Sequence, residues 1–155
     1  MATRLWLLRH GDAEPHGVKE DSLRELTDQG RLEASWAGAA LAALGAPATV
    51  LTSPRTRAMQ TAAIAAGRFG GEPSIAPSLG GGFRAADALE MIDRNPGSDL
   101  LLVGHMPDVA LVVGELTGAN VGFRTGGLAL LRGDAGSWEL ASLLRPREAR
   151  AIAGE

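Results

Sequence analysis

Short apolar runs alternate along the chain with longer segments whose apolar residues recur at helical spacing. Residues 4–9, 48–53 and 99–105 are typical of strands, and the last run is apolar throughout, as expected of a strand buried on both faces. Helices are predicted within residues 27–44, 54–69, 83–95 and 106–118. This alternation favours an α/β fold with a mostly parallel central sheet.

The first predicted helix has the clearest boundaries. Thr27 is a suitable N-cap, and Gly45 and Pro47 end the periodic pattern. Its apolar positions are expected to form one face against the sheet, namely Leu32, Trp36, Ala39, Ala40, Ala43 and Leu44. Ser53 and Pro54 form a cap and first-turn pair that is expected to open the second helix.

The remaining segments complete the sheet and its connections. Prolines in residues 73–79 indicate a peripheral strand, since proline cannot donate to a central ladder. A terminal β-hairpin is predicted from residues 123–133 and 138–146, followed from Arg147 by a frayed helix or coil. Residues 11–25 show no periodicity, and a loop of that length inside a compact domain suggests a functional role.

Composition narrows the function classes. A length of 155 residues indicates a single domain over residues 1–155, and no dense basic tract accompanies the net charge of −3, which disfavours nucleic acid as a partner. The absence of cysteine removes disulfides, thiolate metal sites and cysteine nucleophiles. No stretch resembles a signal peptide or a membrane span, so a cytoplasmic protein without a membrane partner is expected. The oligomeric state stays open.

Charged residues stand at the ends of three predicted buried elements. Arg9-His10-Gly11 ends the first strand, Arg55 and Arg57 lie in the first turn of the second helix, and His105 ends the 99–105 strand. Arginines at a helix start oppose the helix dipole unless an anion joins them, although either could instead extend into solvent. Because ligands of α/β sheets bind at the carboxyl ends of strands, these side chains are expected to converge on one anion-binding pocket.

Two arginines and two histidines suit a phosphoryl group. Guanidinium groups hold its oxygens, and their charge lowers the pKa of a nearby imidazole, which keeps the ring neutral and nucleophilic. His10 is the candidate nucleophile, since the glycine after it permits a tight turn, and His105 is the candidate hydrogen-bond donor to the phosphoryl group. The expected product is a covalent phosphohistidine that water hydrolyses.

These residues resemble the histidine phosphatase superfamily. Arg9-His10-Gly11 matches its "RHG" hallmark, and "LTDQG", "TSPRTRAMQTA" and "LLLVGHMP" resemble three further segments. The short length and "RHGDA" are similar to the small SixA-type phosphohistidine phosphatases. The resemblance implies a three-layer αβα sandwich of the phosphoglycerate mutase-like kind, without metal or organic cofactor. It also implies that His10 accepts the phosphate and that Arg9, Arg57 and His105, rather than Arg55, complete the phosphate pocket.

The group that protonates the leaving group is not evident. Asp21 stands where SixA-type members carry an acidic residue, with Arg24 beside it, and could protonate a leaving group or orient water, or be a solvated loop carboxylate. A surface-loop role is expected for His16, and turn roles for Asp12 and Glu14. The chain carries no insertion that could supply the acid found in larger relatives.

A weak general acid favours phosphohistidine as substrate, because its nitrogen leaves as neutral imidazole with little help. The leading hypothesis is therefore a phosphatase acting on a phosphohistidine-bearing protein. The alternatives are a phosphatase of small phosphomonoesters and a non-catalytic phosphate-binding module, while a mutase would need a closing cover. A metal site is disfavoured by the presence of only three histidines, and "GGGF" and "TGGL" lack nucleotide-loop spacing.

Overall fold

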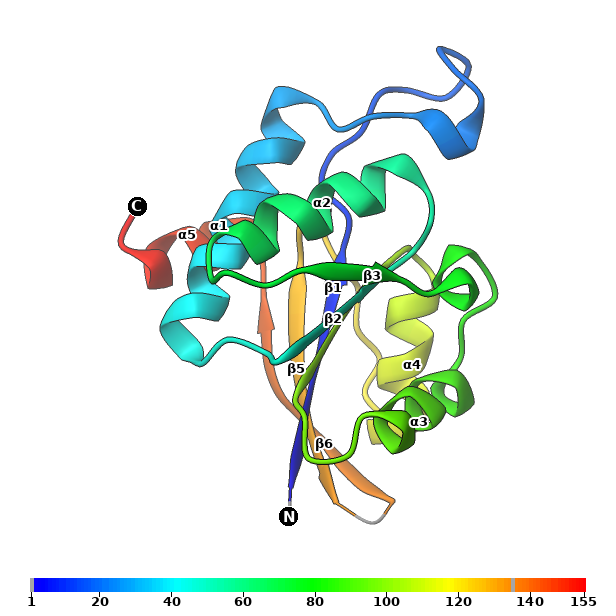
Figure 1. Ribbon diagram of the computed structural model, residues 1–155, viewed down its shortest axis with the longest axis vertical. Helices are drawn as coiled ribbons and strands as arrows, with labels where there is room; N and C mark the ends of the chain where they lie inside the picture. The colour runs from blue at the N-terminus through cyan, green and yellow to red at the C-terminus, as the bar shows by residue number, and fades with distance from the viewer. Residues whose placement is uncertain (1, 135) are drawn as a thin grey trace.

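The computed structural model describes residues 2–134 and 136–155 (Figure 1). Within them, the strands are β1 (Thr3–Arg9), β2 (Thr49–Thr52), β3 (Pro73–Ile75), β4 (Leu100–Gly104), β5 (Leu128–Asp134) and β6 (Ser137–Leu144). The helices are α1 (Asp28–Leu44), α2 (Thr56–Gly67), α3 (Ala85–Arg94), α4 (Asp108–Thr117) and α5 (Pro146–Ala153). Two short 3-10 helices, η1 (Asp21–Leu23) and η2 (Pro77–Gly80), lie in connections.

The strands form one six-stranded sheet in the order β3-β2-β4-β1-β5-β6. The four strands from β3 to β1 are parallel, β5 is antiparallel to β1, and β6 is antiparallel to β5. The central strand β4 is fully buried, as its uninterrupted apolar sequence predicts. The proline-containing β3 occupies an edge, where a missing N–H donor costs no ladder hydrogen bond.

Helices cover both faces of the sheet and make the fold a three-layer αβα sandwich (Figure 1). On one face α3, α4 and the segment around η2 bury Leu5, Leu7, Leu100 and Leu102 of the sheet. On the other face α1 and α2 bury the alternate strand residues, among them Trp6 and Leu8. The expected fold class is confirmed. No helix of the described chain is long and apolar enough to cross a membrane.

Helix α1 has the predicted ends, but only part of the predicted face is buried, namely Ala39, Ala40 and the half-buried Trp36. The Thr27 hydroxyl accepts a hydrogen bond from the backbone N–H of Gly30, and Gly45 ends the helix at φ 104°. The buried face is made mainly of small residues, which are Gly30, Ala34, Ala37, Gly38, Ala39 and Ala40, together with Glu33 and Leu41. At Gly38 a Cβ would lie 2.3 Å from the Ala65 carbonyl oxygen, so α1 and α2 approach closely. Leu32, Ala43 and Leu44 were expected to be buried and are exposed.

The chain end also departs from the expectation of a frayed helix or coil. Residues 146–153 form α5, which starts with a capping box of Arg145 and Glu148 and packs against α1. The guanidinium carbon of Arg150 lies 5.1 Å from the ring centroid of the half-buried Trp36. Helix α2 begins two residues later than a Ser53 cap would give, with Arg55 at the N-cap, although the Ser53 hydroxyl accepts the Arg55 N–H.

Candidate active site

The sheet topology brings the predicted residues to one edge. In the order β2-β4-β1, three neighbouring parallel strands end at Thr52, Gly104 and Arg9, so Ser53, His105 and His10 leave the sheet side by side. The backbone N–H of His10 donates to the Gly104 carbonyl at 3.1 Å, which extends the ladder past the strand ends. Because β5 runs in the opposite direction, its start reaches the same edge.

A pocket of about 310 Å³ opens at this edge, and as the candidate site of the reaction it is called the catalytic pocket below. Its lining includes four of the five predicted site residues, and in full consists of Arg9, His10, Asp12, Ala13, His16, Arg24, Arg57, His105, Met106 and Thr125. Asp12 was expected to be a turn residue and lines the pocket, where its carboxylate accepts the Thr27 hydroxyl at 2.7 Å. His16 reaches the rim with 83% of its side chain exposed.

Gly11 lets the chain turn directly after the nucleophile candidate. A Cβ at this position would lie 2.4 Å from the carbonyl oxygen of Gly30, where α1 passes against the turn. The Gly11 N–H donates to the hydroxyl of Thr61, which in turn donates to the Arg57 carbonyl. The turn after β1 is therefore held against both α1 and α2, and this fixes the position of His10.

His10 is buried, and one of its two ring nitrogens is engaged in a hydrogen bond. Its Nδ1 lies 2.7 Å from the Gly11 carbonyl oxygen, an atom that can only accept, so Nδ1 carries the proton and Nε2 is the unprotonated nitrogen. Burial, with the charges of Arg57, Arg9 and Arg24, lowers the pKa of His10 to about 4. The ring is therefore neutral at pH 7, with the lone pair of Nε2 available for attack.

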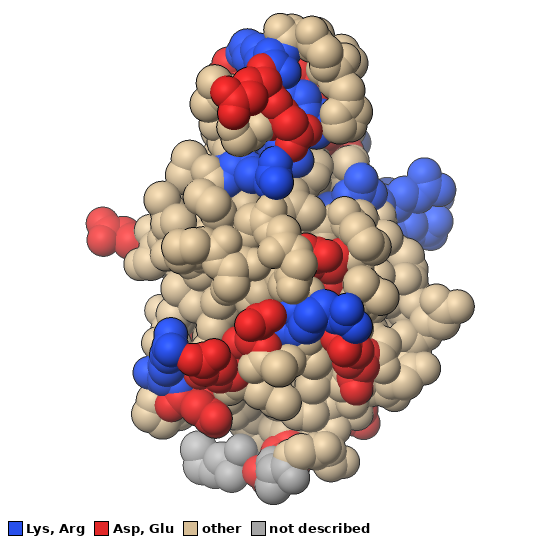
Figure 2. Space-filling view, turned by 90° about the vertical axis from the view of Figure 1, so that its right-hand side faces the viewer, with Lys and Arg blue, Asp and Glu red and all other residues tan. Residues whose placement is uncertain are grey.

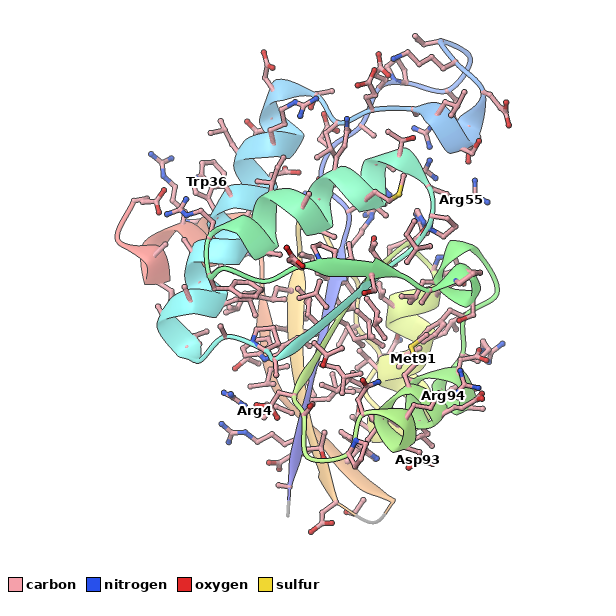
Figure 3. All side chains as sticks on the ribbon, viewed as in Figure 1. Arg4, Trp36, Arg55, Met91, Asp93 and Arg94 are labelled. Carbon is pink, nitrogen blue, oxygen red and sulfur yellow. The ribbon has the colours of Figure 1, made fainter. Side chains whose placement is uncertain are left out.

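The side chains of Arg57 and Arg55 line different cavities, although both residues lie at the start of α2. Arg57 is buried in the catalytic pocket, with its Nη1 donating to the Asp21 carbonyl at 2.8 Å. Arg55 lines a separate hollow, where it donates to the Gly80 carbonyl and pairs with the Asp21 carboxylate at 2.5 Å. Figure 3 shows Arg55 beyond the start of α2, beside the 14–25 segment. Of the two, Arg57 is the one that can contact a ligand of the pocket.

His105 is oriented by Ser53. Its Nε2 lies 2.7 Å from the Ser53 hydroxyl oxygen, which already accepts the Arg55 N–H. Because Ser53 is fully buried, its hydroxyl proton needs an acceptor, and Nε2 of His105 provides one. This arrangement places the ring proton on Nδ1. Burial, followed by the neighbouring His10 and Arg57, lowers the pKa of His105 to about 3, and the two histidine rings lie 5.1 Å apart between centroids.

The aperiodic segment between β1 and α1 folds into a lobe, defined here as residues 14–25, that projects beyond the sheet (Figure 1). Figure 2 shows side chains of both charges gathered on this projection at the top of the view. An isolated bridge between Ala13 and Leu26 closes its base. Gln60 of α2 fastens the base by accepting the Leu26 N–H at 2.8 Å and donating to the Glu25 carboxylate.

The lobe supplies Arg24, a pocket residue that the sequence analysis named only as a neighbour of Asp21. Arg24 is buried, donates to the Glu14 carbonyl at 2.7 Å and pairs with the Asp21 carboxylate. Its position depends on how the lobe folds back over the sheet edge, which no periodicity in residues 14–25 indicates. The useful signal was an arginine inside a long polar loop that follows the first strand.

Asp21 lies behind the arginines and does not line the catalytic pocket. Its carboxylate is within 3.4 Å of Arg24, Arg55 and Arg57. Burial acts to raise the pKa of Asp21, but the hydrogen bond from Arg24 and the three positive charges outweigh it, so the pKa is lowered. A carboxylate held in its ionised form is a poor proton donor. The geometry instead supports a role in positioning Arg24 and Arg57.

Three buried polar atoms of the pocket residues have no partner among the described residues: Nε of Arg9, Nε of Arg57 and Nδ1 of His105. Unpaired buried donors are costly, and the oxygen atoms of a bound anion would supply acceptors for them. The same pocket contains three guanidinium groups and one carboxylate, that of Asp12. Its donor set and charge therefore suit a phosphoryl dianion.

The chain is similar to known proteins in sequence and in fold. Residues 5–80 match the model of the histidine phosphatase superfamily (branch 1). The chain is 35% identical over 144 residues to an uncharacterised protein of Picosynechococcus sp. strain PCC 7002, with 84% of this chain and 86% of that protein covered. A structure assigned as the phosphohistidine phosphatase SixA from Agrobacterium tumefaciens has a TM-score of 0.79 and 28% identity, covering 93% of this chain and 99% of that one.

The fold has a further match in a structure of the protein histidine phosphatase SixA complexed with tungstate. Its TM-score is 0.81 at 23% identity, and the match covers 94% of this chain and 99% of that chain. The fold is thus the phosphoglycerate mutase-like one. Together with the family match over the segment that carries Arg9, His10 and Arg57, these similarities show that the chain belongs to the histidine phosphatase superfamily.

Proposed function

We propose that this protein hydrolyses phosphohistidine on a protein substrate through a covalent phosphohistidine intermediate at His10. The observation that carries the proposal is the bond between Nδ1 of His10 and the Gly11 carbonyl, which leaves Nε2 unprotonated in a pocket lined by three arginines. The similarity to a structure assigned as the phosphohistidine phosphatase SixA supports the same substrate class.

In the first step, the lone pair of His10 Nε2 forms a bond to phosphorus while the P–N bond of the substrate breaks. The electron pair of that bond goes to the substrate nitrogen, and the ring leaves as neutral imidazole because its other nitrogen carries a proton. Arg9, Arg24 and Arg57 hold the phosphoryl oxygens, and Nδ1–H of His105 donates to one of them. In the second step water attacks phosphorus, the electron pair of the enzyme's own P–N bond returns to Nε2, and the released phosphate keeps the protons of the water.

The polar groups of the site favour a nitrogen leaving group over an alkoxide. Asp12 is the only carboxylate in the lining described here, and its Oδ2 accepts the Thr27 hydroxyl. Asp21 lies outside the lining with a lowered pKa. Imidazole leaves with little proton assistance, whereas an alkoxide requires a positioned acid. A small phosphomonoester, whose alkoxide needs such an acid, is the second candidate substrate.

Specificity constants for phosphohistidine peptides and for a panel of phosphorylated metabolites test the proposal. The peptides are expected to exceed every metabolite by at least about tenfold in kcat/KM, and His10→Ala is expected to abolish turnover and acid-labile labelling of the enzyme. Arg94→Ala, an exposed position on α3, serves as the matched control and should retain activity. A preference for one sugar phosphate would show that small phosphate esters are the substrates. Phosphate binding without turnover would show that the protein is a binding module.

A further inference from the structure

The sheet edge that carries the catalytic pocket continues into a second hollow. Leu128 at the start of β5 pairs with both Leu8 and Leu144, so β6 also ends at this edge. We call this hollow of about 470 Å³ the flank groove, lined by Met106, Gly122, Phe123, Arg124, Leu143, Leu144, Arg145 and Glu148. Met106 lines both cavities, so the flank groove adjoins the catalytic pocket.

The backbone that carries Arg124 is fixed against the catalytic residues. The preceding Phe123 accepts a hydrogen bond from Nη1 of Arg9 at 2.8 Å through its carbonyl. Three residues after Phe123, the N–H of Gly126 donates to the His10 carbonyl at 3.0 Å. The intervening Thr125 lines the catalytic pocket. The backbone at Arg124 is therefore held directly beside that pocket.

Arg124 is also the uncompensated charge of the flank groove. The other arginine of the lining, Arg145, donates to Glu148 at 2.9 Å, and Arg147 lies 3.5 Å from the same carboxylate. Arg124 is exposed, and its side chain makes no hydrogen bond or ion pair within the part of the chain that the structure describes. In a protein with a net charge of −3, this leaves a local positive site next to the phosphate pocket.

The floor of the flank groove is apolar. Phe123 is buried, Met106 and Leu144 are partly buried, and Leu143 keeps 38% of its surface exposed. An apolar floor with a cation at its rim suits neighbouring side chains of a polypeptide, one apolar and one carboxylate. A second phosphate on a small molecule could pair with Arg124 but would leave the floor uncovered.

We propose that the flank groove binds an acidic polypeptide segment adjacent to the phosphohistidine of the protein substrate, with a substrate carboxylate on Arg124 and an apolar side chain on the floor. The inference rests on the proposed function, since it names the kind of protein whose phosphohistidine enters the pocket. Charge complementarity at a rim position contributes to partner choice more than to the chemical step.

The test compares two phosphohistidine peptides of equal length, flanked by glutamate in one and by lysine in the other. The wild type is expected to prefer the glutamate peptide by about tenfold in kcat/KM, through KM, and this preference should weaken as ionic strength rises. Arg124→Glu is expected to abolish or reverse the preference. Arg94→Glu changes the net charge equally on α3, away from the pocket (Figure 3), and should keep it.

Equal kcat/KM for the two peptides in the wild type, or an unchanged preference in Arg124→Glu, would overturn the inference. Hydrolysis of an aryl phosphate but of neither peptide would overturn both the protein substrate and the acidic segment, while the chemistry at His10 would stand. If Arg124→Glu instead altered selectivity only among small doubly anionic esters, the flank groove would be a small-molecule subsite. The peptide ratio within one variant does not depend on its absolute rate, so the result is separable from the His10→Ala test.

Discussion

The buried neutral state of His10 makes the stability of the protein depend on pH. The pKa of His10 is about 4 in the folded chain and returns to about 6.5 on unfolding. Between these values the unfolded chain binds a proton that the folded chain does not, so stability falls as the pH drops from 6.5 towards 4. The shift disfavours the folded state by about 2 kcal/mol at pH 5, but by only about 0.2 kcal/mol at pH 7.

Replacing His10 with asparagine removes this titration while keeping a side-chain N–H that can donate to the Gly11 carbonyl. Between pH 7 and pH 5 the wild type should therefore lose about 2 kcal/mol more unfolding free energy than His10→Asn. Urea denaturation at both pH values, in buffers free of phosphate and sulfate, measures the difference. His105 titrates in both proteins, so its contribution largely cancels.

His16→Asn provides the matched control, because it removes a histidine whose side chain is 83% exposed. Its unfolding free energy should follow the wild-type dependence on pH. If His10→Asn and the wild type lost the same stability between pH 7 and pH 5, His10 could not be held as a desolvated neutral ring. The argument for a free Nε2 lone pair at neutral pH would then fail.

Three further substitutions test the support around the pocket. Gly11→Ala should lower the free energy of unfolding by about 3 kcal/mol and Tm by roughly 10 °C, because the new Cβ would overlap the Gly30 backbone. Gly67→Ala on α2 is the control and should not destabilise the protein, since no atom lies near the new Cβ. Asp21→Asn should lower kcat about tenfold by releasing the arginines from their common carboxylate, and Asp21→Glu should restore part of the loss; an unchanged kcat would remove the positioning role. Ser53→Ala should lower kcat by a similar factor in a steady-state assay, since His105 loses the partner that fixes its tautomer, and full activity would refute that assignment.

The convergence of the main site residues could be predicted because it follows from strand ends. Arg9, His10 and His105 each follow an apolar run that forms a buried strand, and parallel strands bring their carboxyl ends to one edge. The choice of Arg57 over Arg55 came from the family resemblance, not from the helix pattern, which left both open. The structure places Arg57 in the lining of the pocket and Arg55 outside it.

Other features could not be predicted, because tertiary contacts determine them. Helix α1 buries small residues rather than its largest apolar ones, since close packing against α2 at Gly38 favours backbone approach over side-chain bulk. Arg24 reaches the pocket only because Gln60 and the Ala13–Leu26 bridge hold the base of the lobe. Contacts between a loop and a distant helix leave no periodic trace in the sequence.

The lobe explains how a mildly acidic protein can concentrate positive charge at one edge. Arg24, Arg55 and Arg57 would repel one another without the Asp21 carboxylate, which pairs with all three from outside the catalytic pocket. That carboxylate lies outside the catalytic pocket, whereas Arg24 and Arg57 line it. Placing Asp21 in the pocket itself would have cancelled the field that a phosphoryl dianion requires. We therefore expect the separation of the carboxylate from the pocket to favour the binding of an anion there.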